Sequence, residues 1–276
     1  MDICVLGPFR ATQDGVPLHL TAVKPRKVFA LLALQANRLV PVPALVEEVW
    51  GERPPRSVHT TLQTYILQLR NLIGTALGDG ADAPPGGAKS ILVTEPGGYR
   101  LDTQGGLIDA QEFHALADAG HKASEQGDWQ AAAAHFGKAL ALWRGPALTD
   151  VQCGVLLEAE AVRLDESRMS ALHGQIEAGL RLGRHHALIG ELSALTTRHP
   201  LYEDFHEQLM IALYRAGRRG DALSVYHRLR ASLKEGLGLD PSPGIEYLHR
   251  AVLDSSPHLV LDGSLPDHVP TLARAN

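Results

Sequence analysis

Cysteine is scarce in this sequence, with only Cys4 and Cys153 among 276 residues. Two cysteines can build neither a metal cage nor a disulfide framework, so a reducing compartment is the expected setting. Long apolar runs are also missing. No stretch reaches the length that spans a membrane, and the first residues lack the basic start and apolar run of a signal peptide. We therefore expect a cytoplasmic protein without a membrane partner.

Sequence patterns for catalysis and cofactor binding are lacking as well. Of the fourteen histidines, His185 and His186 are adjacent and so point to different sides of a helix. Pro96-Gly97-Gly98 lacks the Lys-Ser/Thr pair that follows a phosphate-binding loop. Other histidines occur singly, without the helical pairing and carboxylate that a metalloprotease needs: His199, His206, His227 and His249. The sequence therefore predicts no enzyme, no cofactor and no metal site.

The net charge of −5 argues against a protein that binds nucleic acid over its whole surface, but the charge is distributed unevenly. Residues 1–102 contain ten Lys or Arg against nine Asp or Glu, a net charge of +1. Residues 103–276 contain sixteen against twenty-two, a net charge of −6. Any contact with DNA is therefore expected within the first 102 residues.

A helix predicted over Ser57–Ile73 has two faces of different chemistry. The helical period places one apolar face on Val58, Leu62, Tyr65, Ile66, Leu69, Leu72 and Ile73. The opposite face carries Thr60, Gln63, Thr64, Leu67, Gln68 and Asn71, with Arg70 at its edge. The helix has no acidic residue, and its hydroxyls and amides are groups that hydrogen-bond to base edges and phosphates. This pattern favours a helix that enters a DNA groove, and an uncharged helix packed on another element is the alternative.

The segments before this helix predict a small sheet and a first helix. Ile3–Leu6 and Val16–Leu20 have the pattern of short strands around an Asp-Gly turn. Thr21 is expected to cap a helix that stops at Asn37. The first turns of that helix carry cations that a phosphate could neutralise: Lys24, Arg26 and Lys27.

A second helix and a hairpin complete the first domain. Pro43 can open the second helix, and Trp50–Arg56 ends it before Ser57 caps the third. After a loop over Gly74–Lys89, residues 91–94 and 99–101 flank a glycine turn and predict a β-hairpin. A sheet, three helices and a terminal hairpin make a winged helix-turn-helix, in which the hairpin lies along the DNA backbone.

Beyond a short Asp/Gly linker at residues 102–106, the sequence is almost entirely helical in pattern. Two segments share the spacing of a tetratricopeptide repeat, in which Gly precedes Ala by five residues and Ala precedes an aromatic residue by four. They are Gly127 with Ala132 and Phe136, and Gly217 with Ala222 and Tyr226. Gly183 lies 34 residues before Gly217, which is the repeat period. The small residues permit close approach of paired helices, and the aromatic ring fills the gap.

Several segments together resemble a known family. In the first domain they are Val40–Val46 with Trp50-Gly51, Leu62–Ile66 with Leu69-Arg70, and Gly98–Leu101. They are similar to the DNA-binding domain of the SARP family, the antibiotic-pathway regulators of actinobacteria, which resembles the output domain of OmpR-type response regulators. Ala141–Val151 and Leu237–Pro243 resemble the bacterial transcriptional activation domain of the same family.

The resemblance implies an activator of antibiotic or secondary-metabolite genes. Such a protein would bind direct repeats near promoters, self-associate on DNA and recruit RNA polymerase holoenzyme. In OmpR-type proteins the loop between the second and third helices contacts the polymerase. The matching candidates here are Trp50, Glu52, Arg53 and Arg56. The alternative is that Trp50 anchors the core and the prolines form a rigid connector.

These observations combine into one expected architecture. We expect a mainly α protein with an α+β winged-helix domain at 1–102, an all-α tetratricopeptide-like domain at 108–254 and a flexible tail at 255–276. The third helix would enter the major groove. The candidate DNA contacts are Gln63, Thr64, Gln68 and Asn71 for base edges, and Thr60, Thr61, Arg70, Arg100, Arg26 and Lys27 for phosphates. With so few cations, one copy should bind weakly and with a shallow salt dependence, and two copies on repeated sites gain effective concentration.

Two other hypotheses remain open. The first keeps the DNA-binding domain but makes the protein a repressor or a ligand-gated regulator whose helical repeats sense the ligand. The second is an adaptor whose winged helix binds protein. Replacing Gln63, Thr64 and Gln68 by Ala would leave promoter binding unchanged in an adaptor, and an activator and a repressor would have opposite effects on transcription.

Overall fold

The structure is a computed structural model that describes residues 1–78 and 85–255. The chain forms two compact units. Unit 1 consists of Met1–Asp118 and Gly137–Ala171, and unit 2 of Ala119–Phe136 and the residues from Leu172 onward. The predicted tail from residue 256 and the middle of the predicted Gly74–Lys89 loop lie outside the described residues. Each unit is considered by itself.

A small antiparallel sheet begins unit 1. Its strands pair in the order β1 (Asp2–Cys4), β2 (Arg10–Gln13) and β3 (Val16–Pro17). The turn between β2 and β3 is at Asp14-Gly15, where both residues have positive φ angles of 52° and 79°. The Ile3 N–H donates to the Leu107 carbonyl at 2.8 Å, so the linker after residue 102 runs beside β1.

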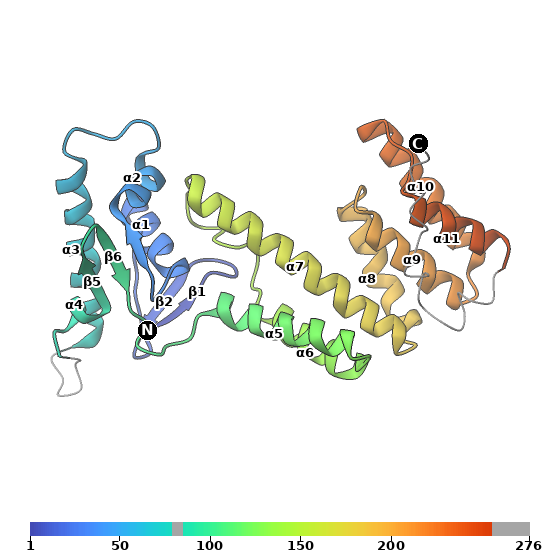
Figure 1. Cartoon of the computed structure of the whole chain (residues 1–276), viewed down its shortest axis with the longest axis horizontal. Coiled ribbons are helices and arrows are strands. Elements are labelled where there is room, and N and C mark those ends of the chain that lie inside the picture. The colour runs from blue at the N-terminus through green and yellow to red at the C-terminus, as the bar shows by residue number, and fades with distance from the viewer. Residues whose placement is uncertain (79–84, 256–276) are drawn as a thin grey trace, which may run out of the picture. The chain divides into compact units, whose positions relative to one another are not determined.

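Four helices and a second sheet follow in the same unit (Figure 1). The elements are α1 (Val23–Leu34), β4 (Leu39–Pro41), α2 (Val42–Trp50), α3 (Val58–Leu77), α4 (Ala88–Ile91), β5 (Leu92–Glu95) and β6 (Gly98–Leu101). The strands pair antiparallel in the order β4-β6-β5. Helix α1 packs against both α2 and α3, and α3 packs against β5. The predicted winged helix-turn-helix is confirmed, with the β5-β6 hairpin as the wing.

Some predicted details of the helices are wrong. Ala22, not Thr21, is the N-cap of α1, and α1 ends at Leu34 because Asn37 takes a left-handed conformation with φ 66°. Ser57 is the N-cap residue of α3, but its side chain makes no capping hydrogen bond. Helix α3 continues past Ile73 to Leu77, and so occupies the start of the predicted loop.

The remaining chain is helical, as predicted. Helices α5 (Asp109–Glu125), α6 (Trp129–Ala141) and α7 (Val155–Arg181) each contribute residues to both units. Unit 2 also contains α8 (His185–Arg198), α9 (Glu203–Arg215), α10 (Arg219–Leu237) and α11 (Pro243–Leu253). Helix α9 packs against α8 and α10, and its apolar residues are buried on several sides. Every helix in the described part of the chain is too short or too polar to cross a lipid bilayer.

The repeat spacing has the expected structural basis in unit 2. Gly127, Gly183 and Gly217 have φ angles of 73°, 76° and 75°, and each lies in the turn before a helix. Phe136 and Ala222 are fully buried, and Tyr226 is 6% exposed. The aromatic residues therefore fill the gaps between paired helices, as the spacing predicts.

Candidate nucleic-acid interface

Helix α3 separates its side chains into a buried and an exposed face. Leu62, Ile66, Leu69 and Ile73 are at most 2% exposed and hold the helix on the core of unit 1. The opposite face is open to solvent and carries Thr60, Gln63, Thr64, Leu67, Gln68 and Asn71. The sequence predicted both faces of this helix, including the six exposed side chains.

The hydrogen bonds of the exposed face leave its amides available. The Thr64 hydroxyl donates to the Thr60 carbonyl at 3.0 Å, and the Thr61 hydroxyl donates to the Ser57 carbonyl at 3.0 Å. The side-chain amides of Gln63, Gln68 and Asn71 have no hydrogen-bond partner among the described residues. Each such amide offers a donor and an acceptor side by side, the pattern that matches the major-groove edge of adenine.

Arg70 connects α3 to the wing instead of projecting toward solvent. Its Nε and Nη2 atoms donate to the Leu92 carbonyl at 3.0 and 2.7 Å, and Nη2 also donates to the Thr94 hydroxyl at 2.7 Å. A guanidinium that makes these bonds fixes β5 against the helix. These bonds give Arg70 a positioning role within unit 1, and its contact with a phosphate stays a prediction.

Arg100, predicted as a wing contact to phosphate, is neutralised within the hairpin. It donates to Glu95 at 2.5 Å and to Asp102 at 2.7 Å, and these hydrogen bonds raise the pKa of Arg100. The Gln104 N–H and Arg100 lower the pKa of Asp102. Two carboxylates beside one guanidinium leave no net positive charge on this part of the wing. A contact between Arg100 and a phosphate stays a prediction, and it would compete with these two ion pairs.

The two cations predicted on α1 are also engaged within unit 1. Arg26 forms an ion pair with Asp150 and donates to the carbonyls of Phe9 and Leu20. The Lys27 ammonium donates to the Glu48 carbonyl at 3.4 Å. Both side chains hold chain segments together, and their contacts with phosphates stay predictions. The sequence could not reveal the pair of Arg26 with Asp150, because these residues are 124 positions apart.

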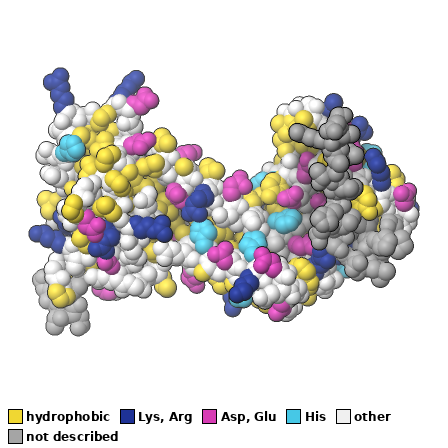
Figure 2. All heavy atoms as spheres, viewed as in Figure 1, with side chains coloured by type: hydrophobic (Ala, Val, Ile, Leu, Met, Phe, Trp, Pro, Cys, Tyr) yellow, Lys and Arg dark blue, Asp and Glu magenta, His cyan; other side chains and the backbone are white. Residues whose placement is uncertain are grey.

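Sequence reasoning assigned two other cations to the polymerase rather than to DNA. Arg53 and Arg56 are exposed in the loop directly before α3, with no ion pair among the described residues. The first turn of α3 has no acidic residue, so its free N–H groups and dipole favour an anion there. The signal that could have identified them is their position, just ahead of the helix N-terminus. On the face of unit 1 shown in Figure 2, cations and acids are interspersed.

The loop between α2 and α3 combines a packed end with an exposed middle. The Trp50 ring stacks on Tyr65 with centroids 5.9 Å apart and planes at 13°, and Lys24 Nζ lies 5.4 Å from the Trp50 ring centroid. Glu52, Arg53 and Arg56 are exposed. Trp50 is half-buried and anchors the start of the loop, while the residues after it remain open to a partner.

Comparison with known proteins identifies the family. The family model described as "Transcriptional regulatory protein, C terminal" matches residues 15–101, and the model described as "Bacterial transcriptional activator domain" matches residues 108–253. Regulatory protein DnrI of Streptomyces peucetius is 47% identical over 95% of this chain and 96% of its own length. This chain belongs to the SARP family. As a SARP protein, it is a transcriptional regulator with an OmpR-type winged helix.

Other SARP relatives are longer than this chain. Transcriptional regulatory protein EmbR of Mycobacterium tuberculosis is 36% identical over 93% of the chain and 64% of EmbR. Regulatory protein AfsR of Streptomyces coelicolor is 36% identical over 92% of the chain and 24% of AfsR. A structure of M. tuberculosis EmbR in complex with a low affinity phosphopeptide superposes with a TM-score of 0.85 at 35% identity, covering 95% of this chain and 66% of that one. The predicted fold class is confirmed.

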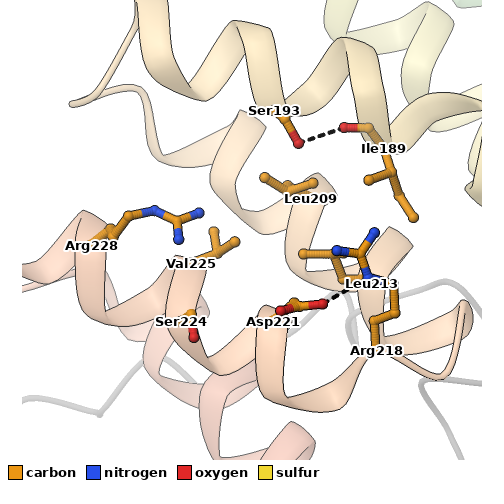
Figure 3. Close-up of a pocket in the computed structure, with 9 residues that line it drawn as sticks. All are labelled: Ile189, Ser193, Leu209, Leu213, Arg218, Asp221, Ser224, Val225 and Arg228. Atoms are coloured by element: carbon orange, nitrogen blue, oxygen red, sulfur yellow. Dashed lines mark hydrogen bonds and ion pairs between the residues drawn. The ribbon is translucent and has the colours of Figure 1, made fainter.

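Unit 2 of this SARP protein contains a second candidate site. Two hollows of about 140 and 410 Å³ lie between α8, α9 and α10 and share Ser193 and Arg228 in their linings. Figure 3 shows Leu209 and Leu213 of α9 on one side of the smaller hollow, with Arg218 bonded to Asp221 at 2.7 Å. Arg228 has no ion pair among the described residues. An apolar wall beside an unpaired guanidinium can hold a small ligand with an acidic group.

Proposed function

We propose that this SARP protein is a sequence-specific DNA-binding activator of antibiotic or other secondary-metabolite genes. The observation that carries the proposal is the exposed face of α3, which has three unpartnered amides, two hydroxyls and no acid. Since an activator of transcription acts on the chromosome, we infer a cytoplasmic location.

The proposed DNA contacts follow from the placement of each group. Gln63, Thr64, Gln68 and Asn71 reach base edges when α3 enters the major groove. Thr60 and Thr61 lie nearer the N-terminal end of α3, where the helix approaches the phosphates. Arg53 and Arg56 supply phosphate contacts beside those predicted for Arg26, Lys27, Arg70 and Arg100.

Few free cations imply weak binding by a single copy. Each phosphate neutralised by Lys or Arg contributes to the salt dependence of affinity, so we expect a shallow slope for one winged helix. Two copies on direct repeats would bind much more tightly through effective concentration, and self-association on DNA would add to this. This arrangement supports a protein that responds to a repeated operator near a promoter.

Recruitment of RNA polymerase holoenzyme is proposed for the exposed residues of the α2–α3 loop. Trp50 fixes the start of the loop by stacking on Tyr65. Glu52 and Arg53 then project charges of opposite sign into solvent. A loop that is anchored at one end presents these charges to a partner at low entropic cost.

The decisive experiment is a footprint of the full chain on the promoters beside its own gene, followed by affinity measurements on the protected duplex. The double variant Gln63→Ala/Gln68→Ala should lose about 30-fold or more in affinity, because each amide that reads a base contributes roughly 1–3 kcal/mol. Gln126→Ala, an exposed glutamine in the turn after α5, is the matched control and should bind as wild type. Absence of any footprint, or equal affinity of the double variant, would overturn the proposal in favour of an adaptor.

A ligand-gated regulator on the same scaffold is the second candidate, and the hollow lined by Arg228 favours it. Purified polymerase distinguishes the two. An activator raises transcription from the protected promoter without any small molecule, a repressor lowers it, and a gated regulator changes transcription only when cell extract supplies a ligand. In the gated case Arg228→Ala should abolish the response to the extract and leave DNA affinity unchanged.

A further inference from the structure

One residue on the exposed face of α3 is not polar. Leu67 is 57% exposed. The structure describes α3 along its whole length, and Leu67 is the large apolar side chain of this helix that is exposed to solvent. The other large apolar residues of this helix are buried or half-buried against unit 1. An exposed leucine alone is ordinary on a protein surface, so its position must decide what it does.

Leu67 lies in the middle of the surface that is proposed to meet DNA. Helical spacing places it one turn after Thr64, one turn before Asn71 and two turns after Thr60. All of these neighbours are exposed hydrogen-bonding side chains. A helix that brings the amides of this face to base edges therefore brings Leu67 into the major groove with them.

The major groove offers one apolar group to such a side chain. Guanine, cytosine and adenine present only hydrogen-bond donors and acceptors there, whereas thymine adds a C5-methyl group. A leucine placed against donors and acceptors would strip them of water without replacing their hydrogen bonds, which costs free energy. Against a methyl group the same contact buries apolar surface on both sides and stabilises the complex.

We propose that Leu67 reads a thymine in the operator through its C5-methyl group. This inference rests on the proposed DNA-binding function. It adds that the operator has a position at which thymine is preferred although no hydrogen bond recognises that base. Such a contact favours thymine over cytosine for two reasons. Cytosine lacks the methyl group, and the leucine would cover the amino group that cytosine presents in the major groove.

The test removes the apolar group from each partner in turn: the methyl group of a thymine, or the branched end of the Leu67 side chain. The probe is the tightest duplex that the full chain selects from a random-sequence library. Each thymine is replaced singly by deoxyuridine, which keeps base pairing and removes only the methyl group. At one position the replacement should weaken wild-type binding about three- to tenfold and leave the affinity of Leu67→Ala unchanged.

A matched control separates this contact from a general loss of exposed leucine. Leu239 is 58% exposed and lies outside the winged helix, so Leu239→Ala should retain the full wild-type response to deoxyuridine. If wild type binds the selected duplex but no thymine methyl is coupled to Leu67, the inference is overturned and the proposed function stands. If no duplex can be selected, both are overturned.

Discussion

In unit 1, buried carboxylates hold the backbones of distant segments, whereas in unit 2 buried rings fill the space left by small residues. The buried acidic residues among the described parts of the chain, Glu48 and Asp109, are both in unit 1. The buried polar residues of unit 2 are uncharged at neutral pH: Thr196, His206 and Gln208. The same chain is therefore stabilised by hydrogen bonds to buried carboxylates in unit 1 and by packing of aromatic rings in unit 2.

The contacts of unit 1 are long-range hydrogen bonds to main-chain N–H groups. The Asp109 carboxylate accepts from the N–H groups of Val5 and Leu6 at 2.8 and 3.1 Å, and from Arg144 at 3.1 Å. Glu48 accepts from the N–H groups at the start of α7. They belong to Gly154, Leu156 and Leu157, at 2.5, 2.9 and 3.0 Å. These N–H groups have no partner within the helix, so Glu48 caps α7 from 106 residues away.

The contacts of unit 2 follow from size. A Cβ atom added at Gly120 or Gly174 would lie 2.7 or 2.6 Å from the Phe136 ring, so only glycine leaves room for the ring at both positions. The ring is fully buried between these helices. In such close packing, a substitution that reduces side-chain volume lowers the stability of the fold.

The largest effect should come from emptying that space. Phe136→Ala removes a buried ring and leaves a cavity, which we expect to cost about 3–5 kcal/mol of the free energy of unfolding. Urea denaturation measures the cost, and amide hydrogen exchange should locate the faster opening in unit 2. Tyr247→Ala removes a ring that is 52% exposed and should cost far less. Equal costs for the two variants would contradict the packing account of unit 2.

Removing the capping carboxylate of unit 1 should have the next largest effect. Glu48→Ala leaves three buried N–H groups without an acceptor, and we expect a loss of roughly 3 kcal/mol. Glu48→Gln should lose less, because its amide oxygen still accepts one hydrogen bond. Urea denaturation gives both values, and hydrogen exchange should show faster exchange at residues 154–157.

The neighbouring glutamate provides the matched control. Glu47 is exposed on the same helix, and Glu47→Ala should change stability by less than about 0.5 kcal/mol. If Glu48→Ala behaves like Glu47→Ala, buried carboxylates do not hold unit 1 together and the contrast between the units disappears.

The same contrast explains what could be predicted from the sequence. The helical-repeat spacing is local, since Gly, Ala and the aromatic residue recur within one helix pair, and the two faces of α3 follow from its period. Asp150, which pairs with Arg26, and the N–H groups that Glu48 caps lie more than a hundred residues away and leave no periodic signal. This is why the sequence did not predict these two contacts.

The ion pairs of the wing lie between these two cases, because their partners are near in sequence but form no repeated pattern. Arg100 and Asp102 are two residues apart in an extended segment, where alternate side chains share a face, so their pairing was legible in principle. Helix boundaries were harder to predict because capping depends on the neighbouring chain. Beyond the end of α1, for example, the Asn37 N–H donates to the Leu101 carbonyl at 2.7 Å, and that carbonyl lies far along the chain.

The smallest effect should come from Glu207, an acid of unit 2 whose pKa is raised strongly by burial. Desolvation, with repulsion from Asp204, Glu177 and Glu203, raises the pKa of Glu207 from 4.5 to about 7. The folded state then keeps a proton that the unfolded chain has lost, so stability falls as the pH rises from about 4.5 to about 7. Glu207→Gln has no charge to bury and should be more stable than wild type at pH 8 by roughly 1–2 kcal/mol.

The pH dependence of that difference tests the comparison of the two units directly. At pH 5 wild-type Glu207 is largely protonated in the folded state, so Glu207→Gln should gain much less there than at pH 8. Glu191→Gln changes an exposed glutamate of α8 and should gain little at either pH. A gain for Glu207→Gln that is the same at both pH values would mean that the charge of this residue is well accommodated. Unit 2 would then accept a carboxylate as unit 1 does, and the distinction between them would not rest on charge.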